Sequence, residues 1–212
     1  MGFKLSYLQE RIFMADRTVI DSMYEDFTAL IEHLEQSGEF SFRDIADNTF
    51  KKTLVLSAAS FFEDKIQKIL LNFVSEQTKK HKLIVAIVKS KAILRQYHTY
   101  FDWDGKNANR FFSLFGSDFK ESASSDVRNN EDLDLYVKNF LELGSIRNKL
   151  VHLNFASIPL DNTCEEIYSL YKKASGFVEY IETKLRTYNS DETRQDQGIT
   201  RHDRAKISPD QA

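Results

Sequence analysis

Hydrophobic residues recur along the first part of the chain with the period of an α-helix. A first long helix is predicted from apolar positions at gaps of three, four or seven: Leu5, Leu8, Ile12, Val19, Met23, Phe27, Leu30 and Leu34. Gly38 is the expected end of this helix. A linker is expected to run from there to about Asp47, whose side chain can cap the start of the next helix. A second apolar face, from Phe50 to Phe73, predicts a second helix that ends near Gln77.

The same period returns in three later segments, with one interruption. A third helix is predicted for about Lys80 to Tyr100. The stretch from Phe101 to Glu131 holds the single tryptophan and two glycines, and it is interpreted as a functional loop with one short helix. A fourth helix is predicted for about Asp132 to Phe155, which Pro159 ends. The last amphipathic helix has its apolar stripe from Ile167 to Leu185.

The composition agrees with a helical fold. Only 7 Gly and 2 Pro occur in 212 residues, which favours few, long elements over many short strands. The 17 Phe and 9 Tyr are ample material for a core. We therefore predict an all-α bundle of about five helices, with one long loop between the third helix and the fourth. Residues 1–188 are expected to form this domain, and the polar residues 189–212 a disordered tail.

Charge and cysteine content narrow the class of protein. A net charge of −3 gives no general basic field, so any nucleic-acid site must be local. The single cysteine, Cys164, excludes an intrachain disulfide and a cysteine cluster for zinc, and it is expected to be buried and unreactive. The chain has no apolar run of membrane-spanning length, and its start is too polar for a signal peptide. We expect a cytoplasmic protein that does not bind membranes.

Candidate chemistry lies on the fourth helix, in the run Arg147-Asn148-Lys149-Leu150-Val151-His152. RNA can be cut when its own 2′-hydroxyl attacks the neighbouring phosphate, which requires a base, an acid and a cation. Histidine titrates near working pH, and arginine offers a charged planar fork to phosphate oxygens. Asn148 lies four residues before His152, on the same face, where it can support the imidazole or a phosphate. Arg147 and His152 are therefore the predicted catalytic residues.

Helix geometry predicts a dimer for such a site. Five positions turn about 140° around a helix axis, so Arg147 and His152 point in different directions. A two-fold pair that sets this helix against its copy would gather two arginines and two histidines in one groove. We therefore expect a homodimer with a composite site.

The Arg147 to His152 spacing resembles the RxxxxH signature of HEPN domains. The motif's position on the penultimate helix, after the Asn107 to Gly116 run, is similar to the RiboL-PSP group and one further group of HEPN proteins. The resemblance covers about Met1 to Tyr188. It implies an all-α fold and a metal-independent endoribonuclease without a cofactor, which acts as a dimer in phage defence or a stress response.

The resemblance also directs attention to further residues. HEPN toxins paired with a nucleotidyltransferase antitoxin often carry a tyrosine two residues after the motif histidine; here Asn154 stands there, which departs from the toxin–antitoxin pattern. Asn154 could still hold a phosphate. Other branches use an acidic residue on an earlier helix, for which Glu63 is the candidate. Lys149, Arg110 and Asn107 are candidate RNA-binding residues. The expected partners are RNA, a second copy and a regulatory or antitoxin protein.

Several alternatives stay open on the sequence alone. Arg147 and His152 could simply complement the dipole at the end of their helix. The aromatic side chains of the 107–116 run could stack on bases beside Arg110 or form a hydrophobic plug. Tyr97, His98 and Tyr100 could form an aromatic platform for a base, but they are interpreted as the half-buried end of the third helix. The competing function class is a non-catalytic helical module that binds RNA, a nucleotide or a protein partner.

Overall fold

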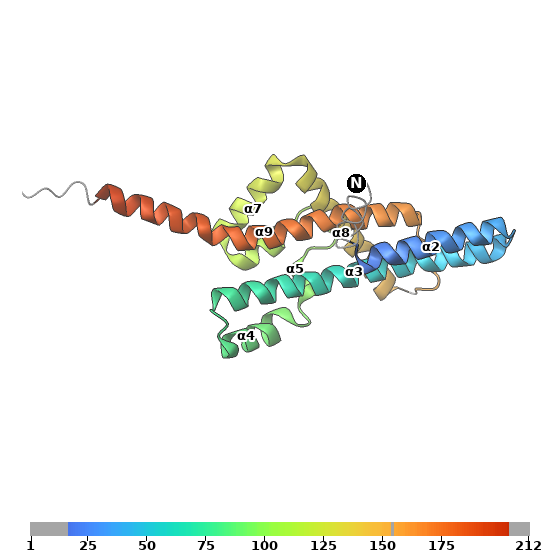
Figure 1. Ribbon diagram of the computed structural model, residues 1–212, viewed down its shortest axis with the longest axis horizontal. Helices are drawn as coiled ribbons and strands as arrows, with labels where there is room; N and C mark the ends of the chain where they lie inside the picture. Colours follow the sequence, from blue (N-terminus) through green and yellow to red (C-terminus); the bar gives the residue numbers. More distant parts are fainter. Residues whose placement is uncertain (1–16, 154, 204–212) are drawn as a thin grey trace, which may run out of the picture.

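The computed structural model describes residues 17–153 and 155–203, and every regular element in these ranges is a helix (Figure 1). The predicted all-α fold class is confirmed. The α-helices are α2 (Val19–Gln36), α3 (Phe40–Gln77), α4 (Lys82–Val88), α5 (Tyr97–Tyr100), α6 (Asn109–Phe112), α7 (Ser117–Asn129), α8 (Glu131–His152) and α9 (Cys164–Asp203). A π-helix (Lys89–Ile93) follows α4, and a 3₁₀ turn (Ser113–Phe115) follows α6.

Three long helices build the core. Helix α9 packs along α8 and α3, and α2 packs on the N-terminal half of α3 (Figure 1). Their inner faces are strongly aromatic, and the largest fully buried side chains include Phe62 of α3, Phe140 of α8, and Tyr171 and Phe177 of α9. Burial of each such ring contributes roughly 2–3 kcal/mol. This packing fixes α3 and α8 side by side, which is the arrangement that positions the site described below.

Local capping explains where the long helices begin. Thr18 and Asp21 form a capping box at the start of α2. At α8, the Asn130 side chain accepts a hydrogen bond of 3.0 Å from the Leu133 N–H, and acidic residues occupy the first turn. At α9, the Thr163 hydroxyl accepts a hydrogen bond from the Glu166 N–H at 3.1 Å. The starts of α2, α8 and α9 are therefore specified by their own sequences, whereas α3 has no side-chain hydrogen bond at its N-cap, Glu39.

The predicted linker between the first two helices is wrong, because α3 begins at Phe40. Gly38 adopts a left-handed conformation, with φ of +74°, and this allows a very short turn. Asp47, expected to cap a helix, lies inside α3. Its carboxylate accepts a hydrogen bond from the Cys164 thiol at 3.3 Å, so the side chain serves a tertiary contact. Leu5, Leu8 and Ile12 of the predicted first helix lie outside the described residues.

The predicted continuous third helix is also wrong. Helix α4 passes into the π-helix, and the chain then turns at Arg95, whose φ is +63°. This turn carries Tyr97 and Tyr100 into the core. Helix α4 itself has no buried residue, and Leu83 is 76% exposed. A helix-period pattern indicated one helix here, whereas the second half is packed and the first half is not.

The segment expected to be a long loop is largely helical. It contains α6 and the 13-residue helix α7, which the sequence pattern did not predict as an element of that length. Phe111 and Phe112 are buried, and Phe115 packs against this core. The hydrophobic-plug interpretation is therefore confirmed. The polar character of α7 obscured this helix in the sequence, since only Phe119 and Ala123 are buried, with Val127 partly buried against the core.

The C-terminal helix is longer than expected. Helix α9 continues past Tyr188, where we expected the domain to end, as far as Asp203, and it extends beyond the bundle in Figure 1. The boundary between domain and tail stays a prediction, and residues 204–212 lie outside the described residues. Within the described ranges, no helix has the length and apolar character needed to cross a membrane.

Candidate functional site

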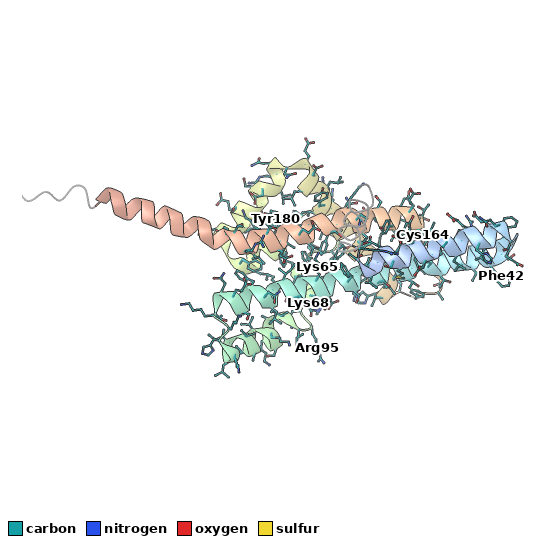
Figure 2. The ribbon with its side chains drawn as sticks, in the orientation of Figure 1. Phe42, Lys65, Lys68, Arg95, Cys164 and Tyr180 are labelled. Atoms are coloured by element: carbon teal, nitrogen blue, oxygen red, sulfur yellow. The ribbon has the colours of Figure 1, made fainter. Side chains whose placement is uncertain are left out.

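A cavity of about 90 Å³ opens between α3, α8 and the segment that follows the π-helix. Its floor is apolar and includes Phe62, Phe140 and Leu143. Its polar wall comes from three separate parts of the chain: Glu63 of α3, Arg95, Tyr97 and His98 around the start of α5, and Arg147 and Asn148 of α8. Arg95 lies on the segment beside the C-terminal half of α3 (Figure 2).

Burial of neighbouring residues positions the polar side chains of α8. Ile146 and Leu150 are buried, which leaves Arg147 and Asn148 half-buried on the cavity side. The Arg147 Nη1 donates a hydrogen bond to the Asn148 Oδ1 at 3.1 Å. Across the cavity, Glu63 accepts a hydrogen bond from the Gln67 amide at 3.1 Å. The site thus combines a cation, an amide and a carboxylate on two rigid helices.

Trp103 forms one wall through contact with Gly144. A Cβ atom on Gly144 would lie 2.1 Å from Cε3 of the Trp103 ring, so the absence of a side chain lets the indole lie directly on α8. The indole N–H donates to the carbonyl of His98 at 3.1 Å. This hydrogen bond lies within the 98–103 segment, and the contact of the indole with Gly144 places that segment against α8, about one turn before Arg147.

The Tyr97 hydroxyl is a polar group inside the cavity. Tyr97 is only 8% exposed, and burial raises the pKa of its hydroxyl far above the ordinary value. The nearby charge of Glu63 acts in the same direction, and that of Arg147 opposes it. The raised pKa keeps the hydroxyl protonated, so it can donate a hydrogen bond to a ligand in the cavity. No described side chain has a buried polar atom that lacks a hydrogen-bond partner, so this hydroxyl is accessible and not an orphaned core group.

The predicted site residues separate into two sets. Arg147, Asn148 and Glu63 meet at the cavity. His152, the last residue of α8, is exposed and does not line it, and neither does the exposed Lys149.

The remaining candidates do not line the cavity, or lie outside the described residues. Arg110 and Asn107 are exposed near α6, where the Asn107 side chain accepts a hydrogen bond from the Asn109 N–H at 3.1 Å. Neither residue lines the cavity. Asn154 lies outside the described residues.

Sequence reasoning missed Arg95, Tyr97, His98 and Trp103 as parts of the site. Tyr97 and Tyr100 are buried, as expected of packed aromatic residues, but they lie on the separate short helix α5 and not at the end of a third helix, and His98 beside them is exposed and lines the cavity. The high density of aromatic and basic residues in this segment was the one signal that could have indicated a site. The left-handed turn at Arg95 brings these residues to α8, but it has no signature in the hydrophobic periodicity.

Cys164 is buried, as predicted. Burial, together with the Asp47 carboxylate, raises the pKa of its thiol to about 12, so the reactive thiolate is suppressed.

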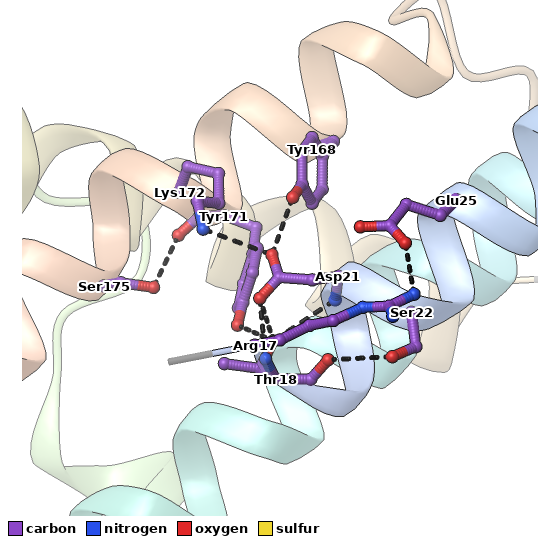
Figure 3. Close-up of polar contacts among 9 residues, drawn as sticks. All are labelled: Arg17, Thr18, Asp21, Ser22, Glu25, Tyr168, Tyr171, Lys172 and Ser175. Atoms are coloured by element: carbon purple, nitrogen blue, oxygen red, sulfur yellow. Dashed lines mark hydrogen bonds and ion pairs between the residues drawn. The ribbon is translucent and has the colours of Figure 1, made fainter. Parts of the chain in front are cut away.

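A second polar cluster joins α2 to α9 around Asp21 (Figure 3). The Asp21 carboxylate accepts hydrogen bonds from the Tyr168 hydroxyl at 2.6 Å, the Lys172 ammonium at 3.2 Å and the Thr18 N–H at 2.7 Å. The hydroxyls of Tyr171 and Thr18 are 2.7 Å apart. Burial raises the pKa of the Asp21 carboxyl, but these hydrogen bonds outweigh burial and lower it overall.

Comparison with known proteins identifies the family. The RiboL-PSP-HEPN family model matches residues 21–187, a span that contains α3, α8 and every residue lining the cavity. Comparisons with curated proteins and with solved structures found no match. Since the match covers well over half of the sequence, the chain belongs to the RiboL-PSP-HEPN family.

Proposed function

We propose that this protein is a metal-independent endoribonuclease of the HEPN type, which acts as a dimer with a composite Arg/His site. The observation that carries the proposal is the convergence of Arg147, Asn148 and Glu63 on an open cavity. None of the three is in the sealed core, so each can meet a substrate. A role in phage defence or a stress response is part of this proposal and rests on the family resemblance alone.

The chemistry follows from the residue types. Arg147 binds the scissile phosphate and offsets the negative charge that grows on its oxygens. An imidazole removes the proton from the 2′-hydroxyl, whose oxygen attacks phosphorus as the bond to the 5′-oxygen breaks. A second imidazole protonates the departing 5′-oxygen. The products are a 2′,3′-cyclic phosphate and a 5′-hydroxyl.

The dimer supplies the imidazoles in this scheme. His152 is exposed at the end of α8 and does not line the cavity that Arg147 lines, so one chain lacks the complete pair at one point. A two-fold partner would place the second copy's His152 at this cavity and receive the same in return. The separation of the two residues in one chain also favours the second candidate function, a non-catalytic module that binds RNA, a nucleotide or a protein partner.

The decisive experiment compares two histidines in equivalent structural positions. His152 lies in the last turn of α8 and His33 in the last turn of α2, and both are exposed. Purified protein is incubated with cellular RNA in excess chelator. His152→Ala should lose about 10²- to 10⁴-fold in cleavage rate while remaining folded, and His33→Ala should keep full activity. Equal activity of the two variants would leave only the helix-dipole role for His152.

Mixing variants tests the composite site. Arg147→Ala and His152→Ala proteins are combined, and the activity of the mixture is compared with the mean of the two. A heterodimer contributes one intact arginine and one intact histidine, so the mixture should differ from that mean. A fully active monomer in light scattering would contradict the composite site.

A further inference from the structure

We propose that Arg95 and His98 complete, with Arg147, a phosphate-binding site in this cavity, and that the site takes a phosphodiester of RNA. Arg95 and His98 stand outside the RxxxxH motif and reach the cavity from the segment after the π-helix. The RNA identity of the ligand rests on the proposed function, whereas the affinity for phosphate does not.

The lining favours an anion. Two arginines and one histidine face a cavity in which Glu63 is the one carboxylate among the described lining residues. Arginine presents planar donors that match phosphate oxygens, and it keeps its charge. Arg147 uses one nitrogen on Asn148, which orients its guanidinium beside the cavity. The cavity therefore offers converging donors from two separate chain segments.

The Tyr97 hydroxyl adds a neutral donor to the site. Tyr97 lines the cavity, and no described side chain has a buried polar atom that lacks a hydrogen-bond partner, so the hydroxyl is an accessible group. Burial of the ring keeps the hydroxyl protonated beside Glu63 and Arg147 by raising its pKa. It can therefore donate a hydrogen bond to a phosphate oxygen.

The approach to the cavity is also basic. Residues 82–95 contain no acidic residue, and they carry four cationic side chains in a protein with a net charge of −3. These are Lys82, Lys89, Lys91 and Arg95. Such a local concentration of charge attracts a phosphate backbone. The strand of RNA would enter along this segment before a phosphate reaches Arg95.

The size of the cavity limits what enters. Its volume of about 90 Å³ is well below the roughly 300–1,000 Å³ of sites that enclose a drug-sized ligand, so the cavity suits a phosphate group better than a whole nucleotide. The base and ribose therefore stay at the mouth, where Arg95 and His98 are exposed. Recognition at this site should depend on the phosphate and not on base identity.

Arg95 provides a sharp variant. Its φ of +63° is a left-handed conformation, which strains an arginine but not a glycine. Arg95→Gly removes the guanidinium and relieves this strain. Lys79 has a φ of +50° but precedes the basic 82–95 segment and does not line the cavity. Lys79→Gly is therefore a matched control for both loss of charge and relief of strain.

The experiment uses Trp103 as the reporter, because it is the single tryptophan and lines the cavity. Its emission is followed while inorganic phosphate or a 2′-O-methyl RNA hexanucleotide, which cannot be cleaved, is added to the full chain. Both should change the emission. Arg95→Gly should weaken hexanucleotide binding about tenfold or more, and His98→Ala several-fold, since hydrogen bonds to charged groups contribute about 1.5–3 kcal/mol. Lys79→Gly should change it less than about threefold.

Each contrary result has a clear meaning. No change in Trp103 emission with either probe, or equal affinities for Arg95→Gly and Lys79→Gly, would overturn the proposal. Binding of phosphate but not of the hexanucleotide would overturn the RNA part. A protein that binds and never cleaves rejects the nuclease and keeps this site, while unchanged cleavage and binding in Arg95→Gly rejects this site alone. Thermal unfolding of Arg95→Gly at or above the wild-type midpoint confirms that the variant is folded.

Discussion

The Asp21 cluster and the cavity beside Arg147 contain similar polar side chains, but these side chains have different roles in the two regions. In the Asp21 cluster, the carboxylate accepts hydrogen bonds from both α2 and α9, so the polar groups hold two helices together. In the cavity, Arg147 bonds to its neighbour on α8 and Glu63 to Gln67 on α3, so neither of these hydrogen bonds joins the two helices. The comparison indicates that polar groups bonded between two helices stabilise the fold, whereas polar groups bonded only within their own helix, at an open cavity, are available to a ligand.

The largest expected effect separates charge from geometry at the cavity. Arg147→Lys keeps a positive charge but loses the planar fork, so it should retain most RNA binding and lose about 10²-fold or more in turnover. Single-turnover cleavage and filter binding measure the two quantities. Lys149→Arg, on the exposed side of the same helix turn, is the control and should change neither. Parallel losses of binding and turnover in Arg147→Lys would indicate a binding module.

The second effect tests the contribution of the Asp21 cluster to stability. Asp21→Ala leaves Tyr168, Lys172 and Thr18 without their shared acceptor, and it should lower the free energy of unfolding by about 3 kcal/mol. Urea denaturation measures this loss. Because the cluster is separate from the cavity lining, the folded variant should cleave RNA at the wild-type rate. A selective loss of activity at full stability would assign Asp21 to the site.

The third effect compares two glycines that each support an aromatic ring. A Cβ on Gly144 would lie 2.1 Å from Trp103, and one on Gly176 would lie 2.5 Å from Tyr136. Both alanine variants should lose about 1–3 kcal/mol of stability through overpacking. Only Gly144→Ala should also change Trp103 emission and weaken phosphate binding, because only Gly144 lines the cavity. Equal ligand affinities in the two variants would separate the indole from the site.

The smallest effect is a pH dependence. The pKa of Asp21 is lower in the folded chain than its ordinary value, since its hydrogen bonds outweigh burial. Its stabilisation is therefore present above pH of about 3.9 and is lost as pH falls through the lower folded-state pKa. The free energy of unfolding of the wild type should fall more steeply below about pH 4 than that of Asp21→Asn. Identical slopes in acid denaturation would contradict this assignment.

Much of the fold could be predicted because amphipathic spacing and caps are local properties. The helix that carries Arg147 and the end of α3 at Gln77 agree with their apolar periods. The break at Arg95 could not be predicted, because a positive φ on an arginine is imposed by tertiary packing of Tyr97 and Tyr100. Periodicity treats this stretch as one helix. The sequence therefore did not predict that Arg95, Tyr97 and His98 line the site.

The motif was easier to identify than its surroundings. Arg147 and Asn148 were predicted from their chemistry, and Glu63 from the family resemblance, and all three line the cavity. The contact of Gly144 with Trp103 depends on two segments about forty residues apart in sequence, a relation that no spacing rule on one helix expresses.

Helix α3 has one further consequence, for backbone dynamics. Its buried positions run from Leu54 to Leu70, while Phe40, Phe42 and Ile45 at its start are more than half exposed. Opening of the α2–α3 tip therefore uncovers little apolar surface, and its amides should exchange with deuterium by frequent local fluctuation. Amides around Glu63 should exchange only when the bundle unfolds. The carboxylate of the cavity is thus carried on the slowly exchanging segment of a helix whose far end is free to fray.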